Sequence, residues 1–292
     1  MTGQFSANAV QQFREQGYYF PYRLMPPEQA EALAARFMAF TESDAAKRYP
    51  RPVDQIYLLK VHLLFKWADE ICHDAGLLDA VESLIGPDIM VWSSGVFWKG
   101  AHSGAHVSWH QDSTNYELDR AEGVVRAWVA LTPATHENGT MHFMPGGHRL
   151  GQIKHNDMKA EGELLSRGET IDLKIDHEKT VPVLIEAGEV SFHHLHMPHG
   201  SGPNNSERPR VNYVITFINP EVAPRVGPDC ATLVRGADRH RHYEHEPRPL
   251  QDFDPEATRA HEKFLVMRNA ILFRGTELPP PPNHPIEARS SY

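Results

Sequence analysis

The fold is decided by short runs such as IMVWSSGVFWK at residues 89–99, GVVRAWVALT at residues 123–132 and RVNYVITFI at residues 210–218. Each run is rich in β-branched and aromatic residues, and glycine, proline or asparagine separates it from the next, which is typical of β-strands. Further runs of this kind are AHVSWHQD (105–112), TMHFMPGG (140–147), VPVLI (181–185) and EVSFHHLH (189–196). Seven or eight short strands without intervening helices predict an antiparallel sandwich or jelly roll.

Helices are predicted on both sides of this strand-rich region. Ser6 is a suitable N-cap and Gly17 a suitable left-handed stop for a first helix, and Pro26-Pro27 opens a second one. Two more short helices are predicted within residues 62–87, and a C-terminal helix over residues 255–273.

The chain is predicted to form one domain over residues 1–292, because no internal repeat and no long linker divides it. Its first part (1–88) is expected to be helical and to pack on the barrel, and its second part (89–219) is the jelly-roll core. The last part (220–292) is expected to contain an extended surface excursion, the C-terminal helix and a frayed tail.

The composition excludes several classes of protein. Hydrophobic residues make up 40% of the 292 residues, which provides a sizeable core and argues against global disorder. The formal net charge of −9 argues against a nucleic-acid partner, because phosphate contacts need a basic surface. Two cysteines give no disulfide framework, no apolar run is long enough to span a membrane, and the first residues do not resemble a signal peptide. We therefore predict a soluble, cytoplasmic protein without a membrane partner; the sequence predicts no oligomeric state.

Histidine is frequent, with 19 residues, so its positions matter more than its number. In the run 105–112, His110 and Asp112 are two residues apart, and on a strand both side chains point to the same face. Such a pair offers one nitrogen and one oxygen to a metal ion. A surface histidine and aspartate near a turn explain this short motif equally well, so the motif alone does not decide.

A second segment, HHLHMPHGSG at residues 193–202, holds four more histidines. His199 stands where a strand gives way to Gly-Ser-Gly, a rim position that keeps a metal ligand accessible. Arg210 follows 11 residues later, and in a hairpin this spacing returns its guanidinium to the neighbourhood of His199. Arginine suits the two-point binding of a carboxylate. The remaining histidines fit structural or supporting roles better than ligation: His193, His194 and His196.

Two histidines and one carboxylate that leave three metal positions open are the ligand set of non-haem iron(II) oxygenases. The same set also suits a zinc ion with an open position. Arg210 favours iron, because a carboxylate-binding group beside the triad suits a 2-oxo acid that chelates the metal at its other end. A zinc-dependent hydrolase or a cupin-like isomerase using the same His/Asp site stays open as an alternative, as does a non-catalytic binding module.

Three segments together resemble the phytanoyl-CoA dioxygenase family of Fe(II)/2-oxoglutarate-dependent oxygenases: WHQD (109–112), AWVALTPATHENGTMHFMPGGHR (127–149) and HGSGPNNSERPR (199–210). The resemblance extends from Phe13 to Phe217. It implies a mainly β fold with helical decoration around a double-stranded β-helix (jelly roll) core. It also implies Fe(II), 2-oxoglutarate as cosubstrate and O2, with release of succinate and CO2.

Carried over to this chain, the resemblance implies that His110, Asp112 and His199 hold the iron and form the catalytic centre. The presence of Asp112 favours oxygenation over halogenation, because related halogenases carry a small residue at this position.

The resemblance also implies that Arg210 binds the distal carboxylate of 2-oxoglutarate, with help from the hydroxyl of Ser201. Trp128 and Lys60 match family residues near the cosubstrate, although a core aromatic and a solvated lysine explain them as well. Lys99 resembles another recurrent lysine, to which the sequence assigns no role.

The substrate is expected to be a small polar molecule, such as a secondary metabolite or an organophosphonate-like compound, hydroxylated at a C–H bond. An acidic chain without a marked basic patch argues against a CoA thioester. Pocket walls in a jelly roll come from alternate strand positions and nearby loops, which gives four candidate substrate contacts: Tyr57, His106, Ser108 and Tyr116.

Overall fold

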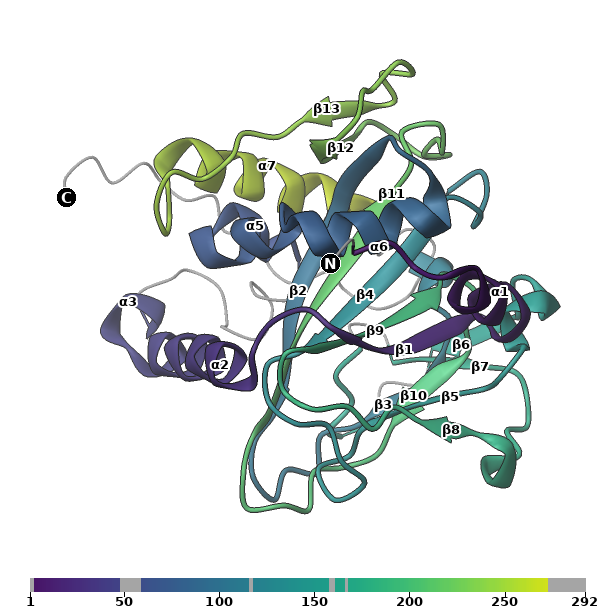
Figure 1. Ribbon diagram of the computed structural model, residues 1–292. Coiled ribbons are helices and arrows are strands. Elements are labelled where there is room, and N and C mark those ends of the chain that lie inside the picture. Colours follow the sequence, from purple (N-terminus) through teal and green to yellow (C-terminus); the bar gives the residue numbers. More distant parts are fainter. Residues whose placement is uncertain (1–2, 48–58, 116–117, 158–160, 166–167, 273–292) are drawn as a thin grey trace.

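The computed structural model describes residues 3–47, 59–115, 118–157, 161–165 and 168–272. Two β-sheets lie at its centre, and helices cover the outer face of the larger sheet (Figure 1). The larger sheet contains, in spatial order, β1 (Tyr18–Arg23), β9 (Glu189–His194), β4 (Val124–Ala130), β11 (Arg210–Ile218), β2 (Ile89–Lys99), β12 (Asp229–Arg235) and β13 (Tyr243–His245). The smaller sheet contains β3 (Val107–His110), β10 (His199–Ser201), β5 (Met141–Phe143) and β8 (Val181–Pro182). A separate hairpin is formed by β6 (His155–Asp157) and β7 (Glu169–Ile171).

The helices are α1 (Ala7–Gln16), α2 (Pro27–Glu42), α3 (Asp44–Lys47), α5 (Lys66–Cys72), α6 (Ala75–Ile85) and α7 (Pro255–Leu272). The first of them begins and ends as predicted. The Ser6 hydroxyl accepts a hydrogen bond from the N–H of Ala9, and Gly17 takes the left-handed conformation with φ of 82° and donates its N–H to the carbonyl of Phe13. Helices α5 and α6 are the two short helices predicted within residues 62–87.

Strands β4 and β11 are buried along their whole length, because helices cover one of their faces and the smaller sheet covers the other. On β4, Val125 and Val129 pack in the cluster shared with the helices, whereas Trp128 and Ala130 pack between the sheets against Phe143. Successive side chains of a strand point to opposite faces, so every second residue of β4 and β11 points into the space between the two sheets. Polar residues at these positions lie inside the protein and need partners there.

The predicted mainly β architecture is confirmed, and one segment differs from its prediction. The first half of the part 220–292, for which the sequence predicts an extended surface excursion, instead contributes β12 at the edge of β2 and β13 in parallel beside it. The buried side chains of Cys230 and Ala231 explain why this segment joins the sheet. The neighbouring proline, arginine and histidine residues obscure the short strand in the sequence.

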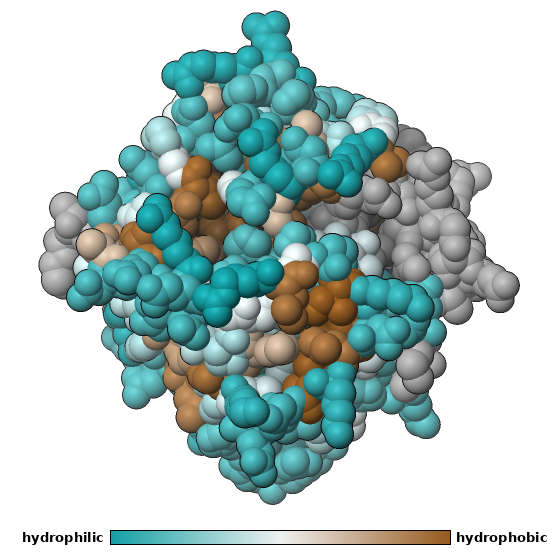
Figure 2. Space-filling model, turned by 90° about the vertical axis from the view of Figure 1, so that its right-hand side faces the viewer, coloured by the Kyte–Doolittle hydropathy of each residue, from teal (hydrophilic) through white to brown (hydrophobic). Residues whose placement is uncertain are grey.

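The face of the molecule in Figure 2 is mostly hydrophilic, with hydrophobic side chains gathered in patches between polar ones. Within the described ranges, no helix combines the length and the apolar character that crossing a lipid bilayer requires.

A buried ion pair joins the segment before α5 to the chain after β13. Nζ of Lys60 lies 2.7 Å from Oε1 of Glu246 and donates a hydrogen bond of 2.7 Å to the carbonyl oxygen of Cys230. The other carboxylate oxygen of Glu246 accepts a hydrogen bond from the hydroxyl of Thr232. Burial raises the pKa of the Glu246 carboxyl, but the charge of Lys60 and the interactions with His62 and Cys230 together outweigh burial and lower the pKa to about 2.

We predict that Glu246 makes the folded protein sensitive to acid. Its folded pKa of about 2 lies below the ordinary value of 4.5. The ionised Glu246 therefore stabilises the folded protein fully above pH 4.5. As the pH falls toward 2, this contribution to the free energy of unfolding, about 3 kcal/mol, is lost. Urea unfolding of the wild type between about pH 2.5 and pH 6 should show this loss, and Glu246→Gln should remove most of it. An equal pH dependence of both proteins would contradict the prediction.

Candidate active site

Three potential metal ligands converge at one end of the smaller sheet. His110 is the last residue of β3 and His199 the first of β10, and the strand register pairs them directly. Asp112 begins the short 3-10 helix that follows β3. One donor atom from each side chain can face a common point, because these atoms all lie within 4.8 Å of one another. All three residues are buried, so the point they surround is shielded from solvent.

Backbone carbonyl groups fix the tautomer of both histidines. Nδ1 of His110 lies 2.9 Å from the carbonyl oxygen of Ser108, and Nδ1 of His199 lies 2.8 Å from that of Met197. A carbonyl oxygen only accepts, so Nδ1 carries the proton in each ring and Nε2 keeps its lone pair. The two Nε2 atoms lie 3.6 and 3.8 Å from carboxylate oxygens of Asp112. Metal-ligating histidines in proteins adopt this arrangement, and the three residues fit a divalent metal ion.

The charges favour the forms that bind a metal. Burial lowers the pKa of the His199 imidazole well below its ordinary value, and the ring is neutral. Burial raises the pKa of the Asp112 carboxyl, but Arg126 and the neighbouring histidines outweigh it, and the pKa lies well below its ordinary value. For His110, burial lowers the pKa, whereas the hydrogen bond and charge of Asp112 raise it above the usual value. Metal binding at Nε2 displaces such a proton.

Two side chains of the larger sheet hold the Asp112 carboxylate. Arg126 on β4 and His193 on β9 are register partners on neighbouring strands. Nη1 of Arg126 lies 2.9 Å from Oδ1 of Asp112, and Nε2 of His193 lies 3.3 Å from Oδ2. Arg126 thus balances the charge of Asp112 and orients it. It is absent from the predicted site residues, although a single cation within the apolar run 123–132 signals a buried anionic partner.

A second polar centre lies where β11 begins. Arg210 is the register partner of Lys99 on β2, and the two cations are only 3% and 1% exposed. Nζ of Lys99 donates a hydrogen bond of 2.8 Å to the hydroxyl of Ser201, and Arg210 donates to the carbonyl of Gly139. The ring of Trp128 lies 5.7 Å from the guanidinium carbon of Arg210. The structure therefore brings together Arg210, Ser201 and Trp128, as the sequence predicts, and adds Lys99.

Neither Lys99 nor Arg210 forms an ion pair with a carboxylate of the described residues. Within the described ranges, the partners of Lys99 and Arg210 are hydroxyl and carbonyl oxygens and not carboxylates. Burial and the neighbouring Arg210 lower the pKa of Lys99 to about 6, and burial lowers that of Arg210 to about 10. Nε of Arg210 and both amide atoms of Asn212 are buried without a hydrogen-bond partner. A carboxylate bound here would supply the missing charge and acceptors, so these residues fit a dicarboxylate cosubstrate.

The sequence matches the family model described as phytanoyl-CoA dioxygenase (PhyH) over residues 13–212, which is more than half of the chain. The chain belongs to the phytanoyl-CoA dioxygenase family. The predicted family is thereby confirmed, and so is the predicted class of enzyme, a non-haem iron dioxygenase. The predicted Fe(II), 2-oxoglutarate and O2 are the cofactor and cosubstrates of this class, and the triad and the cationic centre fit the first two.

Individual relatives agree with the family. The chain is 29% identical to a probable alpha-ketoglutarate-dependent hypophosphite dioxygenase of Stutzerimonas stutzeri over 57% of its own length and 58% of the relative. It is 24% identical to an ectoine dioxygenase of Bordetella parapertussis, over 74% of this chain and 76% of the relative. Among solved structures, the non-heme monooxygenase ThoJ superposes with a TM-score of 0.82 at 37% identity, covering 90% of this chain and 97% of that one. The match to the hypophosphite dioxygenase thus spans less than two thirds of that relative. The superposition on ThoJ confirms the predicted double-stranded β-helix fold.

Lys60, which is predicted to contact the cosubstrate, lies away from the Arg210 centre in this member of the phytanoyl-CoA dioxygenase family. Lys60 is paired with Glu246 and bound to the carbonyl of Cys230 on β12. Strand β12 pairs with β2 at its first residues, Ile89–Val91, whereas Lys99 is the last residue of β2. The surroundings of Lys60 therefore do not support the predicted contact, because its charge is already balanced at the opposite end of that strand.

The predicted substrate contacts are only partly described. His106 and Ser108 both lie near Glu163: the Ser108 hydroxyl donates a hydrogen bond of 2.5 Å to its carboxylate, and Nε2 of His106 lies 3.7 Å from it. Tyr57 and Tyr116 lie outside the described residues. The role of all four as substrate contacts stays a prediction.

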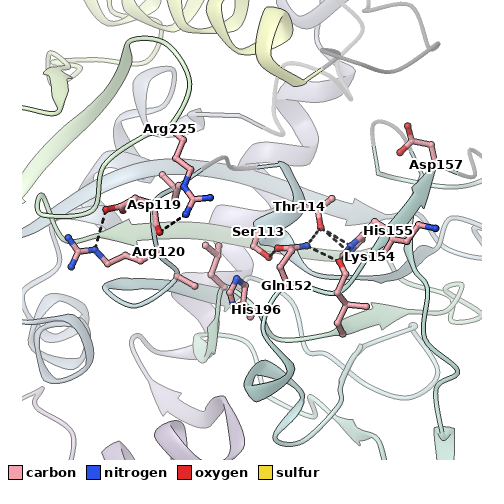
Figure 3. Close-up of a pocket in the computed structure, with 14 residues that line it drawn as sticks. Ser113, Thr114, Asp119, Arg120, Gln152, Lys154, His155, Asp157, His196 and Arg225 are labelled. Atoms are coloured by element: carbon pink, nitrogen blue, oxygen red, sulfur yellow. Dashed lines mark hydrogen bonds and ion pairs between the residues drawn. The ribbon is translucent and has the colours of Figure 1, made fainter.

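A cavity of about 520 Å³ adjoins the segment that follows Asp112, and the three potential metal ligands themselves are not part of its wall. Ser113 and Thr114, which directly follow Asp112 in the chain, form part of its wall. Figure 3 shows them hydrogen-bonded to Gln152 and His155, with arginine and aspartate side chains across the cavity. This lining is mostly polar and carries charges of both signs, which suits a polar ligand.

Proposed function

We propose that this chain is an iron(II)/2-oxoglutarate-dependent dioxygenase that hydroxylates a C–H bond of a small polar molecule and releases succinate and CO2. One observation carries the proposal: a metal ligand and an anion-binding residue share a strand. His199 and Ser201 are two residues apart on β10, so both side chains point to the same face. Ser201 is hydrogen-bonded to Lys99, the register partner of Arg210. The metal site and the cationic centre are therefore adjacent, which suits a short dicarboxylate that bridges them.

The roles that follow from this geometry are as follows: His110, Asp112 and His199 would hold the iron, and Arg210, Lys99 and Ser201 would bind the distal carboxylate of 2-oxoglutarate. When bound, iron and 2-oxoglutarate supply, with O2, the oxidising chemistry that converts a C–H bond into C–OH. The protein itself orients the reactants and sets their electrostatics. It binds Nδ1 of His110 and of His199 to backbone carbonyls, so that Nε2 of each ring faces the metal, and it holds Asp112 in place through Arg126. The three ligands are buried between the two sheets.

The proposed substrate class is supported by two observations. The cavity that adjoins the segment after Asp112 is lined by polar side chains of both charges, which match hydrogen-bonding groups on a small molecule. Two relatives are named for hypophosphite and ectoine, which are both small and polar. A secondary metabolite or an organophosphonate-like compound would fit this cavity.

Metal removal and replacement tests the proposed function. Protein treated with EDTA is expected to form no succinate from 2-oxoglutarate, because the three ligands alone supply no oxidising chemistry. Addition of Fe(II) with ascorbate should restore succinate formation in the presence of a panel that includes ectoine and small phosphonates, and addition of Zn(II) should not. Activity that returns with zinc and needs no O2 would overturn the proposal in favour of a hydrolase or isomerase.

A further inference from the structure

The β6–β7 hairpin is fastened to the segment that carries two of the metal ligands. Nε2 of His155, on β6, lies 2.9 Å from the backbone N of Gln111 and accepts its hydrogen bond. Gln111 stands between His110 and Asp112. The same imidazole lies within hydrogen-bond distance of the Thr114 hydroxyl. The face of the hairpin on which His155 lies is therefore turned toward the segment that carries His110 and Asp112.

Glu169 lies on that face. In the register of the hairpin, Asp157 pairs with Glu169 and His155 pairs with Ile171. Opposed residues of an antiparallel pair project to the same side, as do residues two apart on one strand. His155 and Asp157 line the cavity that adjoins the segment after Asp112 (Figure 3). The carboxylate of Glu169 is thus directed to the side of the hairpin that borders both the cavity and the ligand segment.

The surroundings of Glu169 leave its charge unbalanced. The residue is 1% exposed, yet neither carboxylate oxygen has a hydrogen-bond partner among the residues that the structure describes. Glu163 nearby is also buried, but its oxygens accept hydrogen bonds from the N–H groups of Ser108 and Leu165. A buried carboxylate without a donor or counter-ion costs free energy, because it has lost its hydration without replacement. Among the residues that the structure describes, Glu169 therefore has room for a partner that none of them supplies.

The charges of the hairpin indicate what that partner is. Neither strand of the hairpin contains a lysine or an arginine. Lys154, directly before β6, lines the cavity, and its Nζ lies 3.8 Å from a carboxylate oxygen of Asp172. The imidazole of His155 supplies no positive charge, because its Nε2 accepts the hydrogen bond of the Gln111 N–H and therefore carries no proton. Strand β7 packs beside β3, which ends at His110. A positively charged ligand group that reaches this face would be held by Glu169.

We propose that Glu169 binds a cationic nitrogen of the primary substrate, so that the substrate belongs to the class of amines, amidines and guanidines. This inference rests on the proposed function, because it assigns the substrate of the same site. An ion pair with Glu169 would hold the nitrogen next to the segment that carries His110 and Asp112.

A thermal unfolding experiment tests the first half of this proposal without any substrate. The variant Glu169→Gln keeps the shape of the side chain and removes the unbalanced charge. We expect its unfolding midpoint to rise by about 2–4 °C over the wild type. The matched control is Glu178→Gln, the same change at an exposed position after β7, which should leave the midpoint unchanged. A lower midpoint for Glu169→Gln, or its failure to fold, would overturn the proposal, because both mean that the protein itself uses the carboxylate.

The second half is tested with paired probes on the protein loaded with Fe(II) and 2-oxoglutarate under nitrogen. The pairs are arginine and citrulline, and benzamidine and benzamide, which differ in charge but little in shape. The cationic member should raise the midpoint of the wild type and bind Glu169→Gln at least about tenfold more weakly, and the neutral member should not distinguish the two proteins. Absence of this preference overturns the proposal. The measurement needs no turnover, so it is independent of the succinate assay that tests the proposed function.

Discussion

Replacing Asp112 by alanine is expected to abolish succinate formation and to leave the protein without bound iron. Asp112 is the anionic member of the ligand set, and its loss leaves two neutral imidazoles. It also leaves the charge of Arg126, which lies 2.9 Å from Oδ1 of Asp112, facing the position of the metal. Removing one partner of a buried ion pair costs about 3–5 kcal/mol, which corresponds to a loss of iron affinity of roughly 10²- to 10³-fold or more.

Two further variants make this result specific. Asp112→Asn keeps the shape of the side chain, so it should fold normally and still fail to hold iron. Asp176→Ala removes an exposed aspartate that pairs with Lys179, and it should retain iron and activity. Iron content after anaerobic loading, thermal unfolding and succinate formation are measured on the same samples. Stoichiometric iron and wild-type turnover in Asp112→Asn would show that the carboxylate is not a ligand.

Replacing Arg210 by methionine is expected to raise the 2-oxoglutarate concentration needed for half-maximal rate by about 10²- to 10³-fold. Truncating one partner of a buried charge pair commonly costs 2–5 kcal/mol in binding. The free protein should tolerate this change, because Arg210 and Lys99 repel each other and burial of both is unfavourable. Arg210→Lys should recover part of the affinity, since it keeps the charge and loses the two-point geometry.

Arg239→Met provides the matched control for this variant. Arg239 is an exposed arginine paired with Asp88, at 2.6 Å, and its removal should leave the 2-oxoglutarate dependence unchanged. Binding is followed both by initial rates and by the weak visible charge-transfer band of the anaerobic Fe(II) complex. An unchanged half-saturation concentration in Arg210→Met would place the cosubstrate carboxylate elsewhere.

Residue types at strand ends carry most of what the sequence reveals about the site. His110 and Asp112 stand two residues apart at the end of a β-branched and aromatic run, and His199 and Arg210 stand at the boundaries of the next runs. Because each of these positions is marked by its local sequence, spacing and family resemblance are enough to assign the residues to one site. In the structure His110 and His199 are register partners on neighbouring strands.

Interactions between distant parts of the chain are harder to predict. Lys60 is paired with Glu246, which follows 186 positions later, and no local pattern marks either as the partner of the other. The position of Lys60 in the sequence resembles that of a family lysine, which predicts a cosubstrate contact that the surroundings of Lys60 do not support. Arg126 and Glu169 are charged residues at buried strand positions. The sequence shows that each is unusual, but only the fold shows which groups surround it.

The strand order of the larger sheet has a consequence during protein synthesis. Strand β2 lies between β11 and β12, so its two neighbours are the last long strands of the chain to be made. From Lys99 to Arg210 the ribosome adds 111 residues, which takes on the order of 10 s at roughly 5–20 residues per second. Throughout this interval the nascent chain carries an apolar strand with two open edges. Slower initiation, lower growth temperature or co-expressed chaperones should therefore improve the soluble yield of this protein more than a change of affinity tag.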